Sequence, residues 1–288
     1  MKEYSYYPGC SAEGANRSYD ISARNVAKAL GVDLIELEDW NCCGATTYLS
    51  VEETRAMALS ARNLALVEKD NRDMVTICNG CFRMLRKTNE AMASKGELSD
   101  QLTGALRAAD LQYNGTVKVR HLLDVLVTDV GESEIRSRVR KDLKGLKVAP
   151  YYGCQLTRPK GSFDDPEFPT SLDSLFSWLG AEPVWYPLKT KCCGGMLMTT
   201  QSEVCERLVE KLLRSALQAD AECLATICPL CQINLEGYQE RIGRRFGTSV
   251  DLPILSFTQI MGLAFDIDEK DLLLSDNLTP SEAVVGRY

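Results

Sequence analysis

The chain has 288 residues, of which 45% are hydrophobic and 25% charged, as is typical of one large or two modest globular domains. Its formal net charge of −7 argues against general nucleic-acid binding, which needs a basic footprint. No apolar run approaches the roughly 20 residues that cross a bilayer, and the N-terminus lacks the apolar core of a signal peptide. We therefore expect a cytoplasmic protein with no membrane or nucleic-acid partner.

The first half of the chain alternates short apolar strands with amphipathic helices. Apolar residues between the strands recur at helical spacing, as Tyr19, Ala23 and Val26 do. The predicted elements are a strand at 3–7, a helix at 19–30, a strand at 32–37, a helix at 57–67, a strand at 74–77 and a helix that starts at the next cysteines. A polar, helix-prone insertion at 93–111 precedes a strand and an apolar helix at 117–127.

The second half repeats this order without the insertion. Its predicted elements are a strand at 147–152, a helix at 172–179, a strand at 183–186, a helix at 204–216, a strand at 224–227 and a helix that starts at the next cysteines. A strand and an apolar helix at 253–264 match the tail of the first half, and residues 160–167 are predicted as a loop. We expect the acidic, polar stretch after Asp266 to wrap over the surface or to bind a neighbouring subunit.

Cysteine is the anomaly of the composition, with twelve residues against one histidine. Ten of them form two copies of one motif, in which a single cysteine, a Cys-Cys-Gly triplet and a Cys-x-x-Cys pair each follow a strand. The first copy comprises Cys10, Cys42, Cys43, Cys78 and Cys81, and the second Cys154, Cys192, Cys193, Cys228 and Cys231. Between the single cysteine and the triplet lie 31 residues in the first copy and 37 in the second. Between the second cysteine of the triplet and the Cys-x-x-Cys pair lie 34 residues in both copies. Such agreement indicates a duplicated fold.

The alternation of strands and helices predicts parallel βαβ units with right-handed crossovers. All strands of a half then point the same way, and the three cysteine groups emerge together at the carboxyl edge of one sheet. The predicted fold class is α/β, with two pseudo-symmetric repeated halves that have parallel-strand sheets and cysteine sites at the strand carboxyl ends. We place the boundary near residue 145, which gives domains at 1–145 and 146–288.

Five thiols at one place are consistent with three kinds of site. A structural zinc ion needs only four ligands, and two adjacent cysteines rarely both reach one small ion. Thiol–disulfide exchange at the Cys-x-x-Cys pairs needs only two cysteines and leaves the other groups without a role. A conventional four-iron cluster takes four thiolates, so five ligands suggest a larger or non-cubane core, or one labile ligand. We favour an iron–sulfur cluster, because it gives all five cysteines of a motif a role.

The repeated motif and the opening Tyr6-Tyr7-Pro8-Gly9-Cys10 resemble the cysteine-rich CCG domain family over essentially the whole chain, and most of all the B subunits of heterodisulfide reductases from methanogenic archaea. The resemblance implies that each motif holds one non-cubane [4Fe-4S] cluster. It implies reduction of the mixed disulfide of coenzyme M and coenzyme B in methanogenesis. It also implies that a ferredoxin-like C subunit donates the electrons and that a flavin-containing A subunit feeds it in an electron-bifurcating complex, with a hydrogenase or a formate dehydrogenase as alternative upstream partners.

A disulfide held between two clusters would receive one electron from each, while the protein orients the substrate. The coenzymes carry sulfonate, phosphate and carboxylate groups, so an acidic protein needs a local basic pocket to bind them. The candidates near the motifs are Arg17, Arg158, Lys160, Lys189 and Lys191, with Gln155 as a polar contact. A solvated surface position is the alternative for each of these charges.

The other notable residues are predicted to be structural. His121 lies in an apolar helix and is expected to pack or cap locally, and Cys205 and Cys223 are expected in the core. The three tryptophans are expected in the core or as shielding near the clusters: Trp40, Trp178 and Trp185.

Two other functions share the motif. A CCG subunit of lactate or glycolate oxidation, or of a quinone-linked respiratory complex, would use the clusters as a relay or as a quinone-reducing site. A zinc-stabilised, non-catalytic scaffold would use metal only for folding. The chain has no GxGxxG after a strand, no Walker motif and no ferredoxin-type cluster motif. We therefore expect it to receive electrons from a partner protein.

Overall fold

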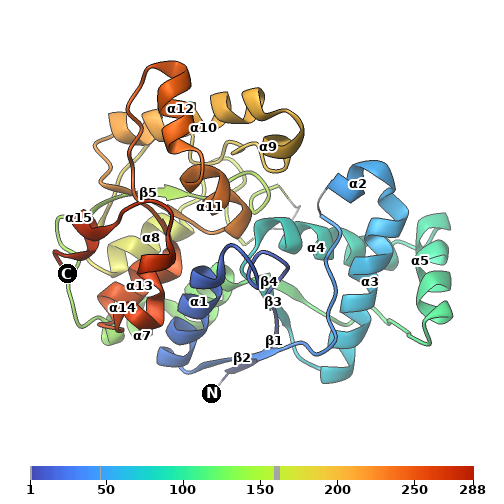
Figure 1. Ribbon diagram of the computed structural model, residues 1–288. Coiled ribbons are helices and arrows are strands. Elements are labelled where there is room, and N and C mark those ends of the chain that lie inside the picture. Colours follow the sequence, from blue (N-terminus) through green and yellow to red (C-terminus); the bar gives the residue numbers. More distant parts are fainter. Residues whose placement is uncertain (1, 46, 159–162) are drawn as a thin grey trace.

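The computed structural model describes residues 2–45, 47–158 and 163–288 (Figure 1). The first half consists of β1 Lys2–Tyr7, α1 Arg17–Ala29, β2 Val32–Glu36, α2 Thr47–Val51, α3 Glu53–Asp70, β3 Met74–Thr76, α4 Asn79–Ala93, α5 Glu97–Ala108, β4 Val119–His121, α6 Leu122–Asp124, the π-helical turn η1 Val125–Val130 and α7 Gly131–Arg138.

The second half follows the same plan. It consists of β5 Lys147–Tyr151, α8 Ser171–Trp178, β6 Glu182–Pro183, α9 Leu197–Thr200, α10 Ser202–Gln218, β7 Cys223–Thr226, α11 Pro229–Glu236, α12 Gln239–Phe246, β8 Ile254–Ser256, α13 Phe257–Ala264, α14 Glu269–Leu272, the 3-10 turn η2 Leu274–Asp276 and α15 Glu282–Val285.

Each half contains one four-stranded sheet in which all strand pairs are parallel. The order is β2-β1-β3-β4 in the first sheet and β6-β5-β7-β8 in the second, so corresponding strands occupy corresponding positions. The strands are largely buried, as expected where helices cover a parallel sheet. The predicted α/β class with two parallel-strand sheets is confirmed. The division into domains at residue 145 stays a prediction.

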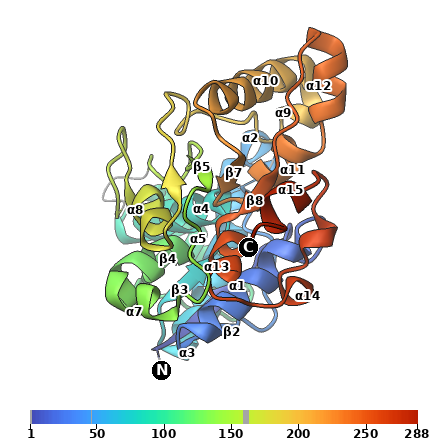
Figure 2. The ribbon, with the colours of Figure 1, turned by 90° about the vertical axis from the view of Figure 1, so that its left-hand side faces the viewer.

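The two halves share one continuous core rather than meeting at a separate polar interface. Helix α1 of the first half packs against α13 and α14 of the second, as Figures 1 and 2 both show. The rings of Tyr19 and Phe257 meet edge to face there, with centroids 6.0 Å apart, and Ser22 Oγ lies 2.7 Å from Thr258 Oγ1. The corresponding pair, α6 and α8, also packs together. The halves are therefore related by a pseudo-twofold arrangement.

Three parts of the second half differ from the prediction. Strand β6 has only two residues instead of the expected four, although the N–H of Val184 still donates to the carbonyl oxygen of Val148 at 2.8 Å. The chain then leaves the sheet, and Trp185 is 70% exposed, so the prediction that this side chain is core or shielding is wrong. The tail after Asp266 does not merely cover the surface, since Leu272 and Val284 are buried in the shared core.

Within the described residues, no helix is both long and apolar enough to cross a membrane. Helices α7 and α12 were not predicted, because both are short and mostly polar. Cys205 and Cys223 are fully buried, as expected.

Candidate functional site

The cysteine groups lie where the parallel topology predicts, beyond the carboxyl ends of the strands. Cys10 follows β1, Cys42 and Cys43 follow β2, and Cys78 follows β3 and precedes α4. The second motif occupies the same positions after β5, β6 and β7. Because equivalent strands lead to equivalent cysteines, each half gathers its five thiols at one sheet edge.

The thiols of each half form a contiguous row. The Sγ atoms of Cys43 and Cys81 are 3.3 Å apart, and those of Cys193 and Cys231 are also 3.3 Å apart. Side-chain interactions link the remaining neighbours, and the resulting sulfur row runs through Cys10, Cys42, Cys43, Cys81, Cys78, Cys228, Cys231, Cys193, Cys192 and Cys154.

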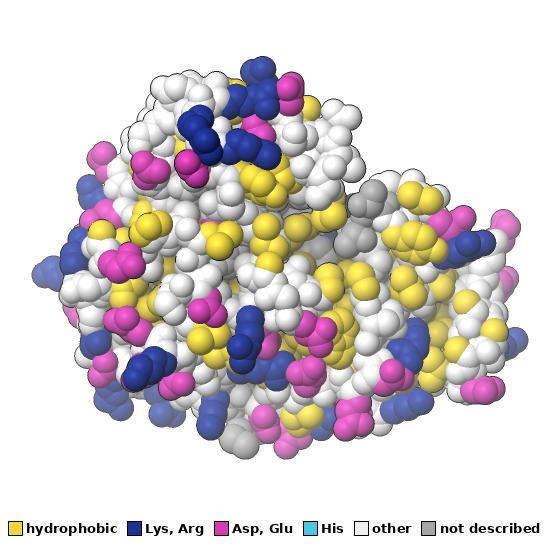
Figure 3. Space-filling model, viewed as in Figure 1, with side chains coloured by type: hydrophobic (Ala, Val, Ile, Leu, Met, Phe, Trp, Pro, Cys, Tyr) yellow, Lys and Arg dark blue, Asp and Glu magenta, His cyan; other side chains and the backbone are white. Residues whose placement is uncertain are grey.

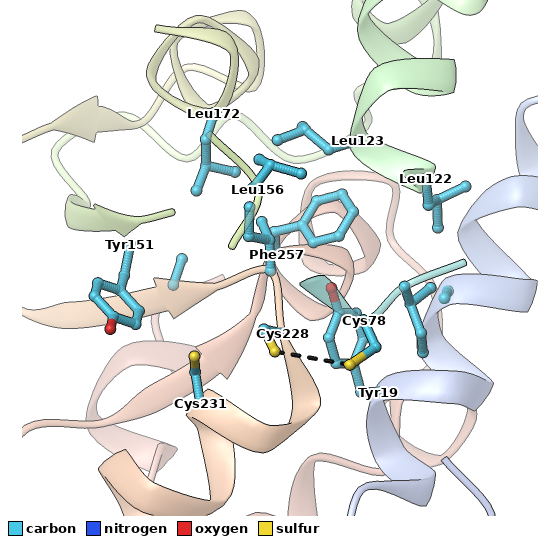
Figure 4. Close-up of a cluster of buried hydrophobic side chains, with 14 of the residues drawn as sticks. Tyr19, Cys78, Leu122, Leu123, Tyr151, Leu156, Leu172, Cys228, Cys231 and Phe257 are labelled. Atoms are coloured by element: carbon cyan, nitrogen blue, oxygen red, sulfur yellow. Dashed lines mark hydrogen bonds between the residues drawn. The ribbon is translucent and has the colours of Figure 1, made fainter. Parts of the chain in front are cut away.

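The two rows meet at the junction of the halves. Cys78 Sγ lies 3.9 Å from Cys228 Sγ (Figure 4), and both side chains are buried. Figure 4 also shows Cys231 on the side of Tyr151, while Tyr19 and Phe257 lie close to the central pair. The duplicated fold therefore brings two five-cysteine sites into direct contact.

Hydrogen bonds repeated in both halves hold the triplets in place. Tyr7 Oη donates to the carbonyl oxygen of Asn41 at 2.8 Å, and Tyr151 Oη donates to that of Lys191 at 2.7 Å. Asn41 and Lys191 directly precede the two triplets. Buried tyrosines from the central strands thus fix both triplets against their own sheets.

Cys205 has a defined structural role outside the motif. Its Sγ donates to the carbonyl oxygen of Cys193 at 3.2 Å, and Ser60 Oγ in the first half donates to that of Cys43 at 2.7 Å. A serine and a cysteine therefore perform the same task in the two halves. Cys205 therefore supports the backbone of the second triplet and is not part of the sulfur row.

The thiols within each row differ in acidity. Cys42 accepts hydrogen bonds from the thiols of Cys10 and Cys43, which lowers its pKa. Donation to Cys42 raises the pKa of Cys43 to about 12. The corresponding thiols behave alike, because Cys192 has a lowered pKa and that of Cys193 is raised to about 12. Hydrogen bonds from the thiols of Cys231 and Cys78 lower the pKa of Cys228 as well. Since metals bind the thiolate, negative charge is best accommodated at Cys42, Cys192 and Cys228.

The surroundings of the sulfurs fit a group larger than one ion. A Cβ on Gly9 would lie 3.1 Å from Cys81 Sγ, and one on Gly153 would lie 3.6 Å from Cys231 Sγ. Both glycines have positive φ and keep side-chain bulk away from the sulfurs. Five thiolates in a row are the donor type that iron–sulfur clusters take.

A pocket of about 440 Å³ opens between the halves. Among the described residues, every cysteine that lines it belongs to the second motif: Cys154, Cys192, Cys193, Cys228 and Cys231. The first half contributes the start of α4 to the lining, and apolar side chains such as Leu49, Met84 and Leu230 complete it. In the space-filling view, hydrophobic side chains gather between the lobes of α9–α12 and α2–α5 (Figure 3). The pocket thus gives access to one of the two sites.

The sequence-predicted substrate residues fall in different places. Gln155 lines the pocket. Arg158 is exposed, and its charge helps to lower the pKa of Cys192, after the larger effect of hydrogen bonds from neighbouring thiols. Lys189 is buried and its Nζ binds Asp173 at 3.1 Å. Arg17 at the start of α1 and Lys191 are exposed, and Lys160 lies outside the described residues.

Two pocket cations were missed by the sequence analysis. Arg83 and Lys87 are one turn apart on α4 and both line the pocket. Arg83 Nη1 donates to Gln155 Oε1 at 3.0 Å, across the junction of the halves. Lys87 pairs with Glu53. The closeness of these two residues to Cys81 is visible in the sequence. The sequence does not show that their side chains face the second half.

Relatives of known name cover nearly the whole chain. The chain is 34% identical over 280 residues to the membrane anchor subunit of the 8-methylmenaquinol:fumarate reductase of Wolinella succinogenes, covering 96% of this chain and 97% of that protein. It is 28% identical over 282 residues to the B subunit of the ferredoxin/F(420)H(2)-dependent CoB-CoM heterodisulfide reductase of Methanosarcina acetivorans, covering 96% and 94%.

A solved structure shares the fold at low sequence identity. A hypothetical protein from Helicobacter pylori superposes with a TM-score of 0.76 at 13% identity, over 95% of this chain and 51% of that one. The model of the cysteine-rich domain called CCG matches residues 4–86 and 148–236, more than half of the chain and both complete motifs. The duplicated sheets, the paired sulfur sites and these matches together establish that the chain belongs to the cysteine-rich CCG domain family.

Proposed function

We propose that this chain is the iron–sulfur subunit of a multi-subunit reductase and that its ten motif cysteines hold two non-cubane [4Fe-4S] clusters. Its reaction is the reduction of a small anionic disulfide, the coenzyme M–coenzyme B heterodisulfide, to two thiols. The observation that carries this proposal is the pocket between the halves, whose lining combines the second cysteine set with Arg83 and Lys87.

The reaction consumes two electrons and two protons for each disulfide. One S–S bond breaks, and two S–H bonds form. Bound clusters supply single electrons, and two of them in contact match the two-electron demand. The electrons come from a partner that corresponds to the ferredoxin-like C subunit, with a flavin-containing A subunit behind it.

The residues of this chain bind and orient the substrate. Arg83 offers positive charge at the pocket wall, suited to sulfonate, phosphate or carboxylate groups, and Lys87 lies one turn away, where an anion would have to compete with Glu53 for it. Leu49, Met84 and Leu230 offer apolar surface for an aliphatic chain. Gln155 connects Arg83 to the second half and holds the guanidinium over the pocket. Such orientation brings the S–S bond to the cysteine-lined wall.

A second candidate is exchange of electrons with a menaquinol-type substrate at the same pocket. The 34% identity to a subunit of an 8-methylmenaquinol:fumarate reductase favours it, and the apolar lining suits a quinone ring. In this alternative the anion-binding residues have no partner on the substrate.

The first test is the metal content of anaerobically purified protein, joined to disulfide reduction with an artificial electron donor. We expect iron and acid-labile sulfide, and Cys193→Ser should abolish turnover and lose the iron of the second site. Cys205→Ser is the matched control, because Ser60 makes the same bond in the first half, and it should keep both. Zinc without iron would support a scaffold and end the redox proposal.

The second test separates the two substrates. Oxidised protein is mixed with coenzyme M, coenzyme B or a menaquinol analogue, and the paramagnetic spectrum is recorded. A new signal specific to the coenzyme thiols supports the disulfide. A response to the quinol alone, with none to either thiol, would replace the first proposal by the second.

A further inference from the structure

Tyr19 is the exception among the buried tyrosines of the described chain. The other tyrosine side chains that are at most 1% exposed all donate a hydrogen bond through the hydroxyl group: Tyr6, Tyr7, Tyr151, Tyr152 and Tyr186. Tyr19 is 0% exposed, yet its Oη has no partner among the described residues. A buried hydroxyl group without a partner is destabilising, and a phenylalanine would fill the same space without that cost. The hydroxyl group of Tyr19 therefore points to an acceptor outside the chain.

The side chain of Tyr19 lies beside the two central sulfurs. Figure 4 shows it next to Cys78 and Cys228, whose Sγ atoms are 3.9 Å apart. Its hydroxyl group bonds to neither sulfur. The ring packs edge to face against Phe257 of the second half, with centroids 6.0 Å apart. Packing from both halves thus fixes a free hydrogen-bond donor at the junction where the two sulfur rows meet.

The chemistry of the junction indicates which acceptor is missing. An iron–sulfur cluster carries inorganic sulfides besides its thiolate ligands, and these sulfurs accept hydrogen bonds. Burial raises the pKa of Tyr19 well above its ordinary value, and negative charge at Cys228 acts in the same direction. The phenol therefore stays protonated and remains a donor beside a negatively charged cluster.

The substrate is a poorer candidate for this acceptor. Tyr19 is absent from the described residues that line the pocket between the halves. Its side chain is instead part of the core that the two halves share. A disulfide in the pocket would meet the cysteines of the second motif and Arg83, but not the Tyr19 hydroxyl group. This placement favours an effect on electron transfer over delivery of a proton to the product thiols.

Building on the clusters of the proposed function, we infer that the Tyr19 hydroxyl group donates a hydrogen bond to a sulfur atom of a cluster bound at the junction of the halves. Reduction adds negative charge to a cluster, and in a buried place that charge is costly. A donor to a cluster sulfur offsets this cost and makes the reduction potential more positive. Tyr19 thereby makes the junction easier for the electron-donating partner to reduce.

Two measurements on anaerobically purified, iron-loaded protein test the inference. Electron–nuclear double resonance in light and heavy water detects exchangeable protons that couple to a paramagnetic cluster, and a potentiometric titration gives the reduction potentials. Tyr19→Phe keeps the ring and its contact with Phe257 and removes only the hydroxyl group. It should keep the wild-type iron content, lose one coupled exchangeable proton and shift a reduction potential to a more negative value.

Tyr6→Phe is the matched control. Tyr6 is also 0% exposed, but its Oη already donates at 2.6 Å to Asp20 Oδ1, on the same helix as Tyr19. This variant should have a lower free energy of unfolding, with the coupled proton and the potentials of wild type. The inference would be overturned, and the proposed function left intact, if Tyr19→Phe kept the coupled proton or the wild-type potentials, or if both variants shifted the potentials equally. Protein without iron would overturn both.

Discussion

The only histidine of the chain lies at the junction of the two sites. His121 Nδ1 accepts the N–H of Leu123 at 3.1 Å, so its proton is on Nε2, which lies 3.1 Å from the carbonyl oxygen of Ile227. Because Ile227 directly precedes Cys228, a neutral imidazole at the end of β4 in the first half holds the backbone that carries the central sulfur of the second half. The expected capping role is confirmed, and the link between halves is additional.

This burial predicts how stability depends on pH. Desolvation lowers the pKa of His121 to about 4, whereas an unfolded histidine titrates near 6.5. Between these values the unfolded chain holds the extra proton, so the free energy of unfolding should fall as pH drops from about 6.5 to about 4, by about 3 kcal/mol in all. Anaerobic denaturant titrations of wild type and His121→Gln should show this dependence in the wild type alone.

A buried carboxyl group makes that comparison necessary. Burial raises the pKa of Glu236 to about 7, so its contribution to stability falls as pH rises through that value. The two groups oppose each other in wild type, and only the difference between wild type and variant isolates His121. A difference that stays constant from pH 4 to 7 would contradict the assignment.

The pocket cations predict a change in substrate affinity. Arg83→Gln removes a charge but keeps polar reach to Gln155. A lost charged hydrogen bond of about 1.5 kcal/mol corresponds to roughly a tenfold rise in KM for an anionic disulfide, with kcat nearly unchanged. Arg244→Gln, a highly exposed site on α12, is the control and should leave both constants unchanged. A fall in kcat alone would argue for a role in chemistry rather than in binding.

At the scale of elements, a buried ion network stabilises the turn after β4. Arg120 binds both oxygens of Asp124, at 2.7 and 2.9 Å, and both oxygens of Asp129, at 2.6 and 2.9 Å. The guanidinium is 5% exposed, so its removal leaves two carboxylates without their partner. Arg120→Met should lower the free energy of unfolding by about 3–5 kcal/mol. Arg136→Met, which breaks only the exposed pair with Glu132, should cost less than about 1 kcal/mol.

Glycine lets helix α3 approach the first triplet. A Cβ on Gly44 would lie 2.7 Å from the carbonyl oxygen of Ala56, and Gly44 has a φ of +79°. Gly31 has a φ of +69° with nothing within 4 Å, so Gly31→Ala measures backbone strain alone, about 1–2 kcal/mol. Gly44→Ala should cost clearly more and should also lower the iron content. Equal losses in the two variants, with full iron content, would show that helix contact is unimportant here.

At the scale of the whole molecule, the repeat predicted most of the fold. The repeated cysteine motif identified the equivalent strands, and hydrophobic periodicity located the longer helices. Together they predicted the two parallel sheets. Helices α7 and α12 were not predicted, because their stability comes from contacts made in the folded chain rather than from an apolar pattern in the sequence.

The sequence predicted those features of the site that depend on one half alone, but not those that depend on how the two halves pack together. Strand order brings the five thiols of a motif together, but the sequence does not say how the halves face each other. Lys189 was selected for its distance along the chain from Cys192, yet its ammonium group turns to Asp173 in α8. Arg83 was overlooked because its partner Gln155 comes from the other half.

The direct contact of Cys78 with Cys228 has one more consequence. The bonds from Asn79 to Tyr152 and from His121 to Ile227 cross the junction close to that contact. A hinge motion that separated the halves would have to break them, so the fold itself sets the distance between the two cysteine sites. For the two clusters proposed here, electron transfer from one site to the other would therefore need no movement of the halves.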